Sequence, residues 1–246
     1  MKRVLLAFIL LFLAPVGVSS AILEREGSTW ETARRDATGL APDPAATPEA
    51  VIQVYAARAF AWRGIFSVHT WIAVKPAGAA AYTRYDVMGW GVQHGAPAIR
   101  VNRMGPDNYW FGSRPVVLLE RRGPEAEALI PRIIAAIEAY PYKDTYRTWP
   151  GPNSNTFIAH IGRSVPELGL EMPGNAVGKD YLPDGALFAP APSGSGFQFS
   201  LLGVAGLMLA LDEGIELNLF GLSFGIDFDD VALKLPGLGR IGAFPQ

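Results

Sequence analysis

The 246-residue chain contains no cysteine. It therefore has no disulfide, no thiolate metal site, no cysteine for lipid attachment and no thiol nucleophile. Histidine is scarce too: His69, His94 and His160 lie far apart, and no HxH or HExxH spacing is present. The sequence gives no pattern for a metal site, and we expect no cofactor.

Charge is sparse and balanced. Charged residues make up 18% of the chain, and the formal net charge is −2. No basic patch with interleaved aromatic residues is present, so nucleic acid is not an expected partner. Glycine (27) and proline (20) are abundant, which predicts short strands and many turns rather than a helical bundle.

The clearest long apolar run lies at the N-terminus. Lys2 and Arg3 precede an almost wholly apolar stretch over residues 4–13, and small residues follow. This is the pattern of a secretory signal peptide, with cleavage after Ser20 or Ala21. The run is shorter than the roughly 20 residues that span a bilayer. We therefore expect export to the periplasm or envelope of a bacterial host, with an uncleaved membrane anchor as the alternative.

Composition divides the chain into four expected segments. They are a signal peptide or short anchor (residues 1–21), a polar linker (22–46), an α+β core (47–196) and an apolar C-terminal β segment (197–246) packed on the core. In the last segment, apolar and polar residues alternate from Ile215 to Leu219, and Asp212-Glu213-Gly214 has the composition of a hairpin turn. These features predict strands rather than a membrane helix.

A hairpin is predicted around the first histidine. Residues 65–75 alternate with the period of a strand, and residues 82–88 return as a second strand after a turn. A symmetric turn pairs residues whose numbers sum to 155, which places Asp86 opposite His69. A register slip of two residues would place Arg84 or Met88 there instead.

Three helices are also predicted. The first starts at Thr47-Pro48-Glu49 and runs to about Phe60, the second opens at Gly123-Pro124-Glu125 with Pro131 as a kink or fresh start, and the third covers residues 155–163. Further short strands are expected over residues 98–103 and 115–121, and residues 165–196 are expected to be mostly loop.

The third helix begins at the most informative motif of the chain, Trp-Pro-Gly-Pro-Asn-Ser-Asn-Thr-Phe over residues 149–157. A nucleophile benefits from a helix N-terminus, because free amides and the helix dipole stabilise negative charge there. Ser154 is the candidate nucleophile. His69 is the candidate base, and Asp86 is the group that would orient its ring.

Four neighbours of these residues are candidates for substrate contacts: Trp71, Trp149, Asn153 and Asn155. A second interpretation needs no chemistry. Asn153, Ser154 and Asn155 are all good helix N-caps, and a lone strand histidine is more often structural than catalytic. Serine is also harder to activate than cysteine, because its hydroxyl is far less acidic.

The chain resembles a bacterial family catalogued as domain of unknown function 3750. The matching stretches include Phe66-Ser67-Val68-His69-Thr70-Trp71, Pro150-Gly151-Pro152-Asn153-Ser154-Asn155-Thr156-Phe157, Glu213-Gly214-Ile215-Glu216-Leu217-Asn218 and Leu235-Pro236-Gly237-Leu238-Gly239-Arg240. The resemblance implies an envelope protein and brings no established activity.

A more distant resemblance links the chain to circularly permuted papain-like peptidases and acyltransferases, which carry an Asn-Cys-Asn-x-Phe stretch. It covers about residues 62–163 and implies a permuted papain-like core, an antiparallel sheet packed on helices, with the nucleophile at Ser154 and the base at His69. The serine departs from that pattern and excludes thiol chemistry.

Two functions from different classes follow. One is a catalytically silent binding or structural domain that keeps a papain-like cleft. The other is a serine-dependent hydrolase or acyltransferase that acts on amide or ester bonds. For either function, the expected partner is a cell-wall peptide, a lipid or an envelope protein.

Overall fold

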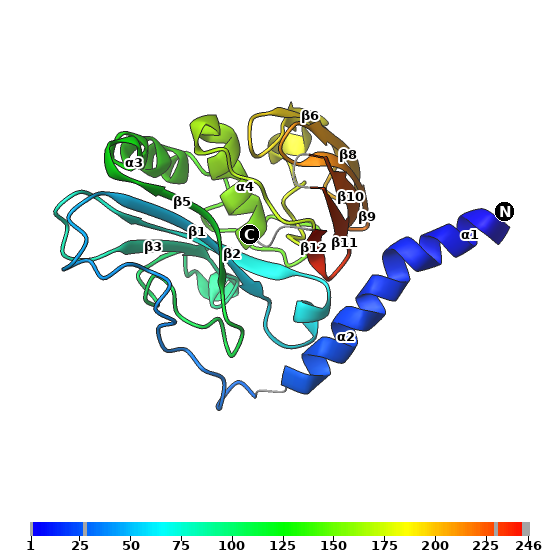
Figure 1. The fold of residues 1–246 in the computed structure, drawn as a ribbon, viewed down its shortest axis with the longest axis horizontal. Helices are drawn as coiled ribbons and strands as arrows, with labels where there is room; N and C mark the ends of the chain where they lie inside the picture. The colour runs from blue at the N-terminus through cyan, green and yellow to red at the C-terminus, as the bar shows by residue number, and fades with distance from the viewer. Residues whose placement is uncertain (1, 27–28, 229–230, 243–246) are drawn as a thin grey trace.

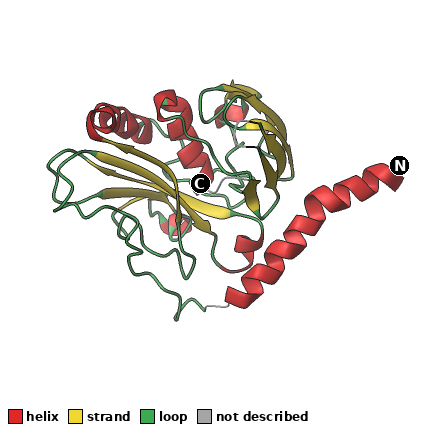
Figure 2. Ribbon diagram, in the orientation of Figure 1, coloured by secondary structure: helices red, strands yellow, loops and turns green. Residues whose placement is uncertain are grey.

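The computed structural model describes residues 2–26, 29–228 and 231–242. The chain is an α+β protein in which, over these residues, one antiparallel sheet of five strands and one of seven are accompanied by a few helices. Figure 2 shows the N-terminal helix apart from the other helices, which lie against the body of the molecule. Short 3₁₀ helices lie at η2 (Ala61–Ile65), η3 (Val92–His94), η4 (Pro166–Leu168) and η5 (Pro183–Gly185).

The central sheet has the strand order β4-β3-β2-β1-β5. Its strands are β1 (Val51–Arg58), β2 (Val68–Lys75), β3 (Thr83–Val87), β4 (Ile99–Val101) and β5 (Val116–Arg122). Helices α3 (Gly123–Glu138) and α4 (Ser154–Ser164) lie along one face of this sheet (Figure 1). The main apolar core fills the space between them, with Ile52, Ile72, Ile133 and Phe157 at its centre.

The predicted helix over residues 47–60 is wrong, because this segment forms strand β1. β1 lies between β2 and β5, and both of its faces are covered, so Val51 to Ala57 are all buried. A strand buried on both faces shows no alternation of polar and apolar residues. The β-branched residues Val51, Ile52 and Val54 favour this strand, whereas the Thr-Pro-Glu helix signal before it starts no helix.

The other predicted elements of the core form, with two adjustments. α3 continues through Pro131 without a new start. β2 and β3 pair as an antiparallel hairpin, but Ile72 pairs with Tyr85 and Ala73 with Arg84, so the partners sum to 157 and the symmetric register was wrong by two residues. Asp86 is therefore diagonal to His69 rather than opposite.

The C-terminal sheet is a meander of strands that follow one another in sequence. Its members are β6 (Phe188–Pro190), β7 (Gly196–Leu201), β8 (Ala205–Ala210), β9 (Gly214–Leu219), β10 (Leu222–Asp227), β11 (Ala232–Leu235) and β12 (Gly239–Gly242). The hairpin predicted at residues 212–214 joins β8 to β9. The sheet begins with β6, before the boundary expected at residue 197.

The face of the C-terminal sheet that turns toward the core is polar. Its buried residues include Gln198, Ser200, Glu216, Asn218 and Lys234. The Glu216 carboxylate lies between two lysines, 2.5 Å from Lys179 Nζ and 3.0 Å from Lys234 Nζ. Lys179 belongs to the loop after α4, so this buried ion network joins the sheet to the core.

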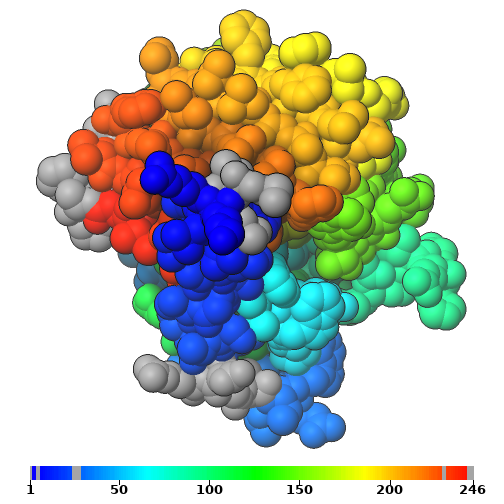
Figure 3. Space-filling model, turned by 90° about the vertical axis from the view of Figure 1, so that its right-hand side faces the viewer, coloured from blue at the N-terminus to red at the C-terminus, as the bar shows by residue number. Residues whose placement is uncertain are grey.

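The N-terminus is helical from α1 (Lys2–Phe8) through the π-helical turn η1 (Ile9–Leu13) to α2 (Ala14–Glu26). This helix projects beyond the body of the molecule in Figure 1 and lies beside the C-terminal strands in Figure 3. Over Leu6–Leu23 it is long and apolar enough to cross a membrane. It is compatible with a signal peptide or an anchor, and it extends five residues past the expected boundary at residue 21.

Candidate active site

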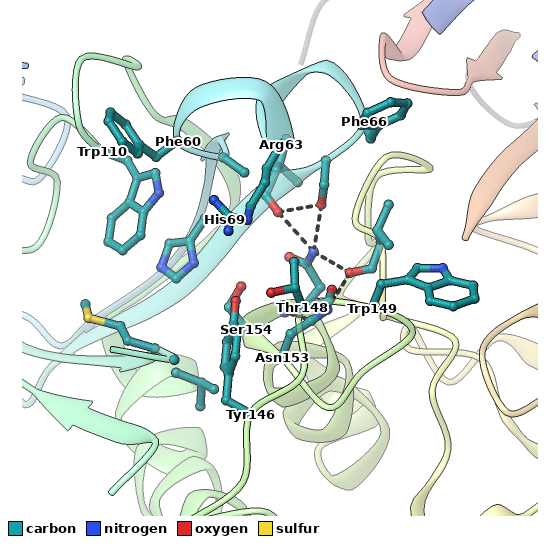
Figure 4. A pocket seen from close by; sticks show the side chains of 18 of the residues that line it. Phe60, Arg63, Phe66, His69, Trp110, Tyr146, Thr148, Trp149, Asn153 and Ser154 are labelled. Carbon is teal, nitrogen blue, oxygen red and sulfur yellow. Dashed lines mark hydrogen bonds between the residues drawn. The ribbon is translucent and has the colours of Figure 1, made fainter. Parts of the chain in front are cut away.

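The residues around Ser154 line a cavity of about 690 Å³ between the central sheet, the start of α4 and the C-terminal sheet. Its walls are rich in aromatic side chains. Those that line it are Phe60, Trp62, Phe66, Trp90, Trp110, Tyr146, Trp149 and Phe220. Figure 4 shows His69 and Ser154 on neighbouring walls of this cavity, one from β2 and the other from α4. Such a concave, mainly apolar site with a few convergent polar groups is typical of a small-molecule or peptide site.

The start of α4 is fixed by Asn153, which is the N-cap. Its Oδ1 accepts hydrogen bonds from the backbone N–H groups of Asn155 (2.9 Å) and Thr156 (3.2 Å), and the Thr156 hydroxyl accepts from the Asn153 N–H (3.1 Å). This is a capping box. Gly178 has a positive φ of 100° and packs against the Asn153 amide so closely that a Cβ there would overlap it.

Asn155 ties the same helix start to the strand that carries His69. Its Nδ2 donates to the carbonyls of Val68 (3.0 Å) and Val177 (2.8 Å), and its Oδ1 accepts from the Thr70 hydroxyl (2.9 Å). The amides of Asn153 and Asn155, which were candidates for substrate contact, are thus engaged by the protein's own backbone and side chains. Both still border the cavity.

Ser154, between these two asparagines, accepts a hydrogen bond from the Thr70 hydroxyl only through its backbone carbonyl (3.3 Å). It is the first residue of α4 and only 4% exposed. Among the hydrogen bonds of the described residues, none involves its hydroxyl, and none takes up its backbone N–H. The cap interpretation therefore accounts for Asn153 and does not account for Ser154.

Two contacts hold the His69 ring in place. Its Nε2 lies 3.0 Å from Asp86 Oδ1, and its ring stacks on Trp110 with centroids 3.6 Å apart and planes 9° apart. Asp86 accepts from Arg84 Nε (2.6 Å) and Nη2 (2.9 Å), while the Arg84 guanidinium lies 4.0 Å from the Trp71 ring centroid. The imidazole position is therefore set by a buried carboxylate, itself set by a buried arginine.

The charges of Asp86 and Arg84 determine which ring nitrogen of His69 carries the proton. Burial alone would raise the pKa of Asp86, but the Arg84 charge and the hydrogen bonds from His69 and Arg84 hold that pKa below its ordinary value. An ionised carboxylate only accepts hydrogen bonds, so His69 Nε2 carries the proton. Burial lowers the pKa of His69, and Asp86 offsets this only in part. The ring is neutral near pH 7, with Nδ1 unprotonated and able to act as a base.

Among the described residues, no hydrogen bond joins the His69 ring to the Ser154 hydroxyl. Catalytic hydrogen bonds are often long before substrate binds, and both side chains face the same cavity (Figure 4). Over the same residues, no group of three or more histidine, aspartate or glutamate side chains is arranged to hold a metal ion.

Acidification is expected to destabilise the fold through His69. Its pKa in the folded protein is lowered, below the value of about 6.5 expected in the unfolded chain. The folded state then binds fewer protons, so the free energy of unfolding falls as pH drops through about 6.5 toward the folded pKa. His69→Gln keeps a donor for Asp86 and removes this titration. Thermal melts at about pH 7.5 and about pH 5.5 should show a larger drop in Tm for the wild type; equal drops would contradict the assignment.

Two of the other candidate residues lie at different depths. Trp149 lines the cavity, is 49% exposed, and donates from Nε1 to the Phe220 carbonyl (2.9 Å). Trp71, a candidate for substrate contact, is instead fully buried and lies outside the cavity lining. Its Nε1 donates to the Pro106 carbonyl (2.7 Å), and it packs between Tyr55 and Arg84. Trp71 therefore packs against His69 and Arg84 on the buried side of the site.

Two residues that shape the site have weak sequence signals. Arg84 is two residues from Asp86 on β3, so alternation places both on one face, and this spacing could have suggested their pairing. Trp110 reaches His69 from the loop between β4 and β5. No local pattern predicts that contact.

The fold and the site define an α+β protein in which a helix N-terminus and an imidazole, itself paired with a buried carboxylate, border one cavity. Residues 49–181, more than half of the chain, match the family described as "Protein of unknown function (DUF3750)". The chain belongs to this family. The matched segment contains His69, Asp86 and Ser154. No curated protein matches the chain, and no solved structure does.

Proposed function

We propose that the cavity is an acyl-transfer site of an exported envelope protein, a hydrolase or acyltransferase of amide or ester bonds with Ser154 as nucleophile. The observation that carries this proposal is His69, which is hydrogen-bonded to Asp86 through Nε2 and leaves Nδ1 unprotonated, in a cavity shared with the buried Ser154, whose hydroxyl has no hydrogen-bond partner among the described residues. The buried Arg84–Asp86 ion pair that holds the imidazole is a weak source of stability, so packing alone does not explain this arrangement.

The proposed reaction has two halves. His69 Nδ1 takes the proton of the Ser154 hydroxyl as Oγ bonds to the substrate carbonyl carbon, and the carbonyl oxygen becomes an oxyanion. The Ser154 N–H at the start of α4 is placed to stabilise that oxyanion. His69 then returns the proton to the leaving amine or alcohol as its bond to carbon breaks. Water, or an acceptor alcohol or amine, releases the acyl group by the reverse sequence.

The chain order of the site supports a permuted papain-like core. The histidine strand precedes the helix that carries the nucleophile, as in the permuted thiol enzymes, and a serine stands where those enzymes have cysteine. In the described chain, Arg63 is the one permanently charged side chain of the cavity lining. A substrate with an apolar or aromatic portion near its carbonyl suits such walls.

A catalytically silent binding domain is the second candidate. The observation that favours it is the lack of a direct hydrogen bond between His69 and Ser154 among the described residues. In this case the aromatic walls bind a peptide or lipid without chemistry, and the helix start serves only as an anion or carbonyl contact.

Labelling with a fluorophosphonate probe decides between the two. We expect covalent labelling of the wild type, none in Ser154→Ala, and a rate about 10²–10⁴-fold lower in His69→Gln. Ser164→Ala is the matched control, because Ser164 is exposed at the other end of the same helix and its loss should leave labelling unchanged. If a folded wild type is not labelled, or labels as strongly as Ser154→Ala, the acyl-transfer proposal fails and the silent domain stands.

A further inference from the structure

The C-terminal sheet buries its polar residues and exposes its apolar ones, which is the opposite of the pattern expected in a water-soluble protein. Its inward positions are polar, whereas its outward positions are apolar and exposed. The outward face, named here the apolar face, includes Phe188, Phe197, Phe199, Leu201, Leu207, Leu209, Ile215, Leu217, Ile226, Leu233 and Ile241, each at least 40% exposed. Cross-strand neighbours such as Leu209 and Ile215, or Ile226 and Leu233, make the apolar face continuous across the sheet.

The apolar face is also free of charge within the described strands. The charged residues of β9, β10, β11 and β12 are Glu216, Asp227, Lys234 and Arg240, and none of them is exposed. A continuous apolar patch of this extent marks an interaction surface rather than ordinary surface scatter. Polar residues inside and apolar residues outside are the pattern of strands that face lipid.

The N-terminal helix contacts the C-terminal sheet and thereby indicates the environment of the apolar face. Phe12 packs against Phe224 of β10, with ring centroids 6.3 Å apart. Ser19 Oγ donates to the carbonyl of Gly237, between β11 and β12 (3.2 Å), and accepts from Arg58 (2.8 Å). Phe12 and Ser19 both lie inside Leu6–Leu23, the stretch that could cross a membrane. If that stretch sits in a bilayer, the strands in contact with it are at bilayer depth as well.

We infer that the apolar face is a membrane-docking surface whose partner is the acyl region of one bilayer leaflet. Strands of six residues reach about 20 Å, less than the roughly 30 Å of a bilayer's hydrocarbon core. The face therefore enters one leaflet and does not span the bilayer. Because it carries no charge, its binding depends on buried apolar area and not on anionic headgroups. This inference does not rest on the proposed reaction.

The absence of cysteine makes a direct test simple, since single-cysteine variants carry one label each. Leu209→Cys and Leu217→Cys place an environment-sensitive fluorophore on the apolar face. Ala135→Cys places it on the exposed side of α3, away from the C-terminal sheet (Figure 1). The labelled full chains are reconstituted in phosphatidylcholine vesicles with and without phosphatidylglycerol, and a doxyl lipid serves as quencher.

Both sheet labels are expected to shift to the blue and to be quenched several-fold more than the Ala135→Cys label, equally in the two lipid mixtures. The labels report the position of the face itself, so anchoring by the N-terminal helix alone would leave them in water. Iodide quenching of the sheet labels as strong as that of the Ala135→Cys label would overturn the proposal. Excimer emission from pyrene at Leu209→Cys that persists on dilution with lipid would also overturn it, by assigning the face to a second copy of the chain.

Discussion

A Ser154→Cys variant is expected to be alkylated at about pH 6 roughly tenfold faster than a Ser164→Cys variant. The introduced thiol would stand at the N-terminus of α4 in the same cavity as His69, and both features favour a thiolate. Active-site thiols of this kind have a pKa of about 6 or below, against about 8.5 for an ordinary thiol. The gain in thiolate at about pH 6 is roughly 100-fold, and the lower nucleophilicity of a less basic thiolate removes about tenfold of that gain.

Ser164→Cys is the matched control because it ends the same helix at an exposed position. There the dipole has the opposite sign and opposes a thiolate. Each variant contains a single cysteine, so iodoacetamide uptake followed by mass spectrometry reads its rate directly. If the two rate–pH curves coincide, the environment of residue 154 does not activate a nucleophile, and His69 is structural.

Glu216→Ala is expected to lower Tm by roughly 6–20 °C. Glu216 is buried and hydrogen-bonded to Lys179 and Lys234, which are buried too. Burial alone would raise the pKa of Glu216, but the two lysine charges hold it below its ordinary value, so the carboxylate is ionised. Removing it leaves two buried ammonium groups short of a partner, at about 3–5 kcal/mol. A chain of this size loses about 2–4 °C per kcal/mol.

The control for this change is Glu167→Ala, which breaks an ion pair with Arg132 in which both side chains are about half exposed. Ion pairs at the protein surface contribute little to stability, so the Tm of Glu167→Ala should match that of the wild type. Differential scanning calorimetry of both variants in the same detergent makes the comparison. Equal midpoints for Glu216→Ala and the wild type would show that the polar inner face of the C-terminal sheet is not essential to the fold.

Local signals in the sequence predicted much of the region around the site. The alternation over residues 65–75 marked β2. The Pro-Gly-Pro-Asn-Ser-Asn stretch predicted the start of α4, and of the three possible caps there, Asn153 is the one that takes up the free amides in the structure. The proximity of His69 and Asp86 was also predicted, although the register was not. Side chains on one face of a hairpin meet diagonally as well as directly across, so the contact survives a slip of two residues.

Burial on two faces and long-range contacts set the limits of such prediction. β1 was missed because a central strand has no polar face to alternate with. Trp110 stacks on His69 from a loop whose path depends on the rest of the fold. The alternation over residues 215–219 predicted a strand but could not tell which face turns inward. Only the position of Lys179 and Lys234 against Glu216 decides that the polar face is inside.

The strands of the C-terminal sheet lie in the order of the sequence, which affects how the protein folds during synthesis. Each strand pairs with its neighbour in sequence, so the sheet grows by local loop closures, which are fast. The ammonium of Lys179 must wait for Glu216, 37 residues later in the chain. At about 5–20 residues per second of synthesis, Lys179 emerges from the ribosome a few seconds before the Glu216 carboxylate to which it donates. The nascent protein closes its last ion pairs only when the final hairpins arrive.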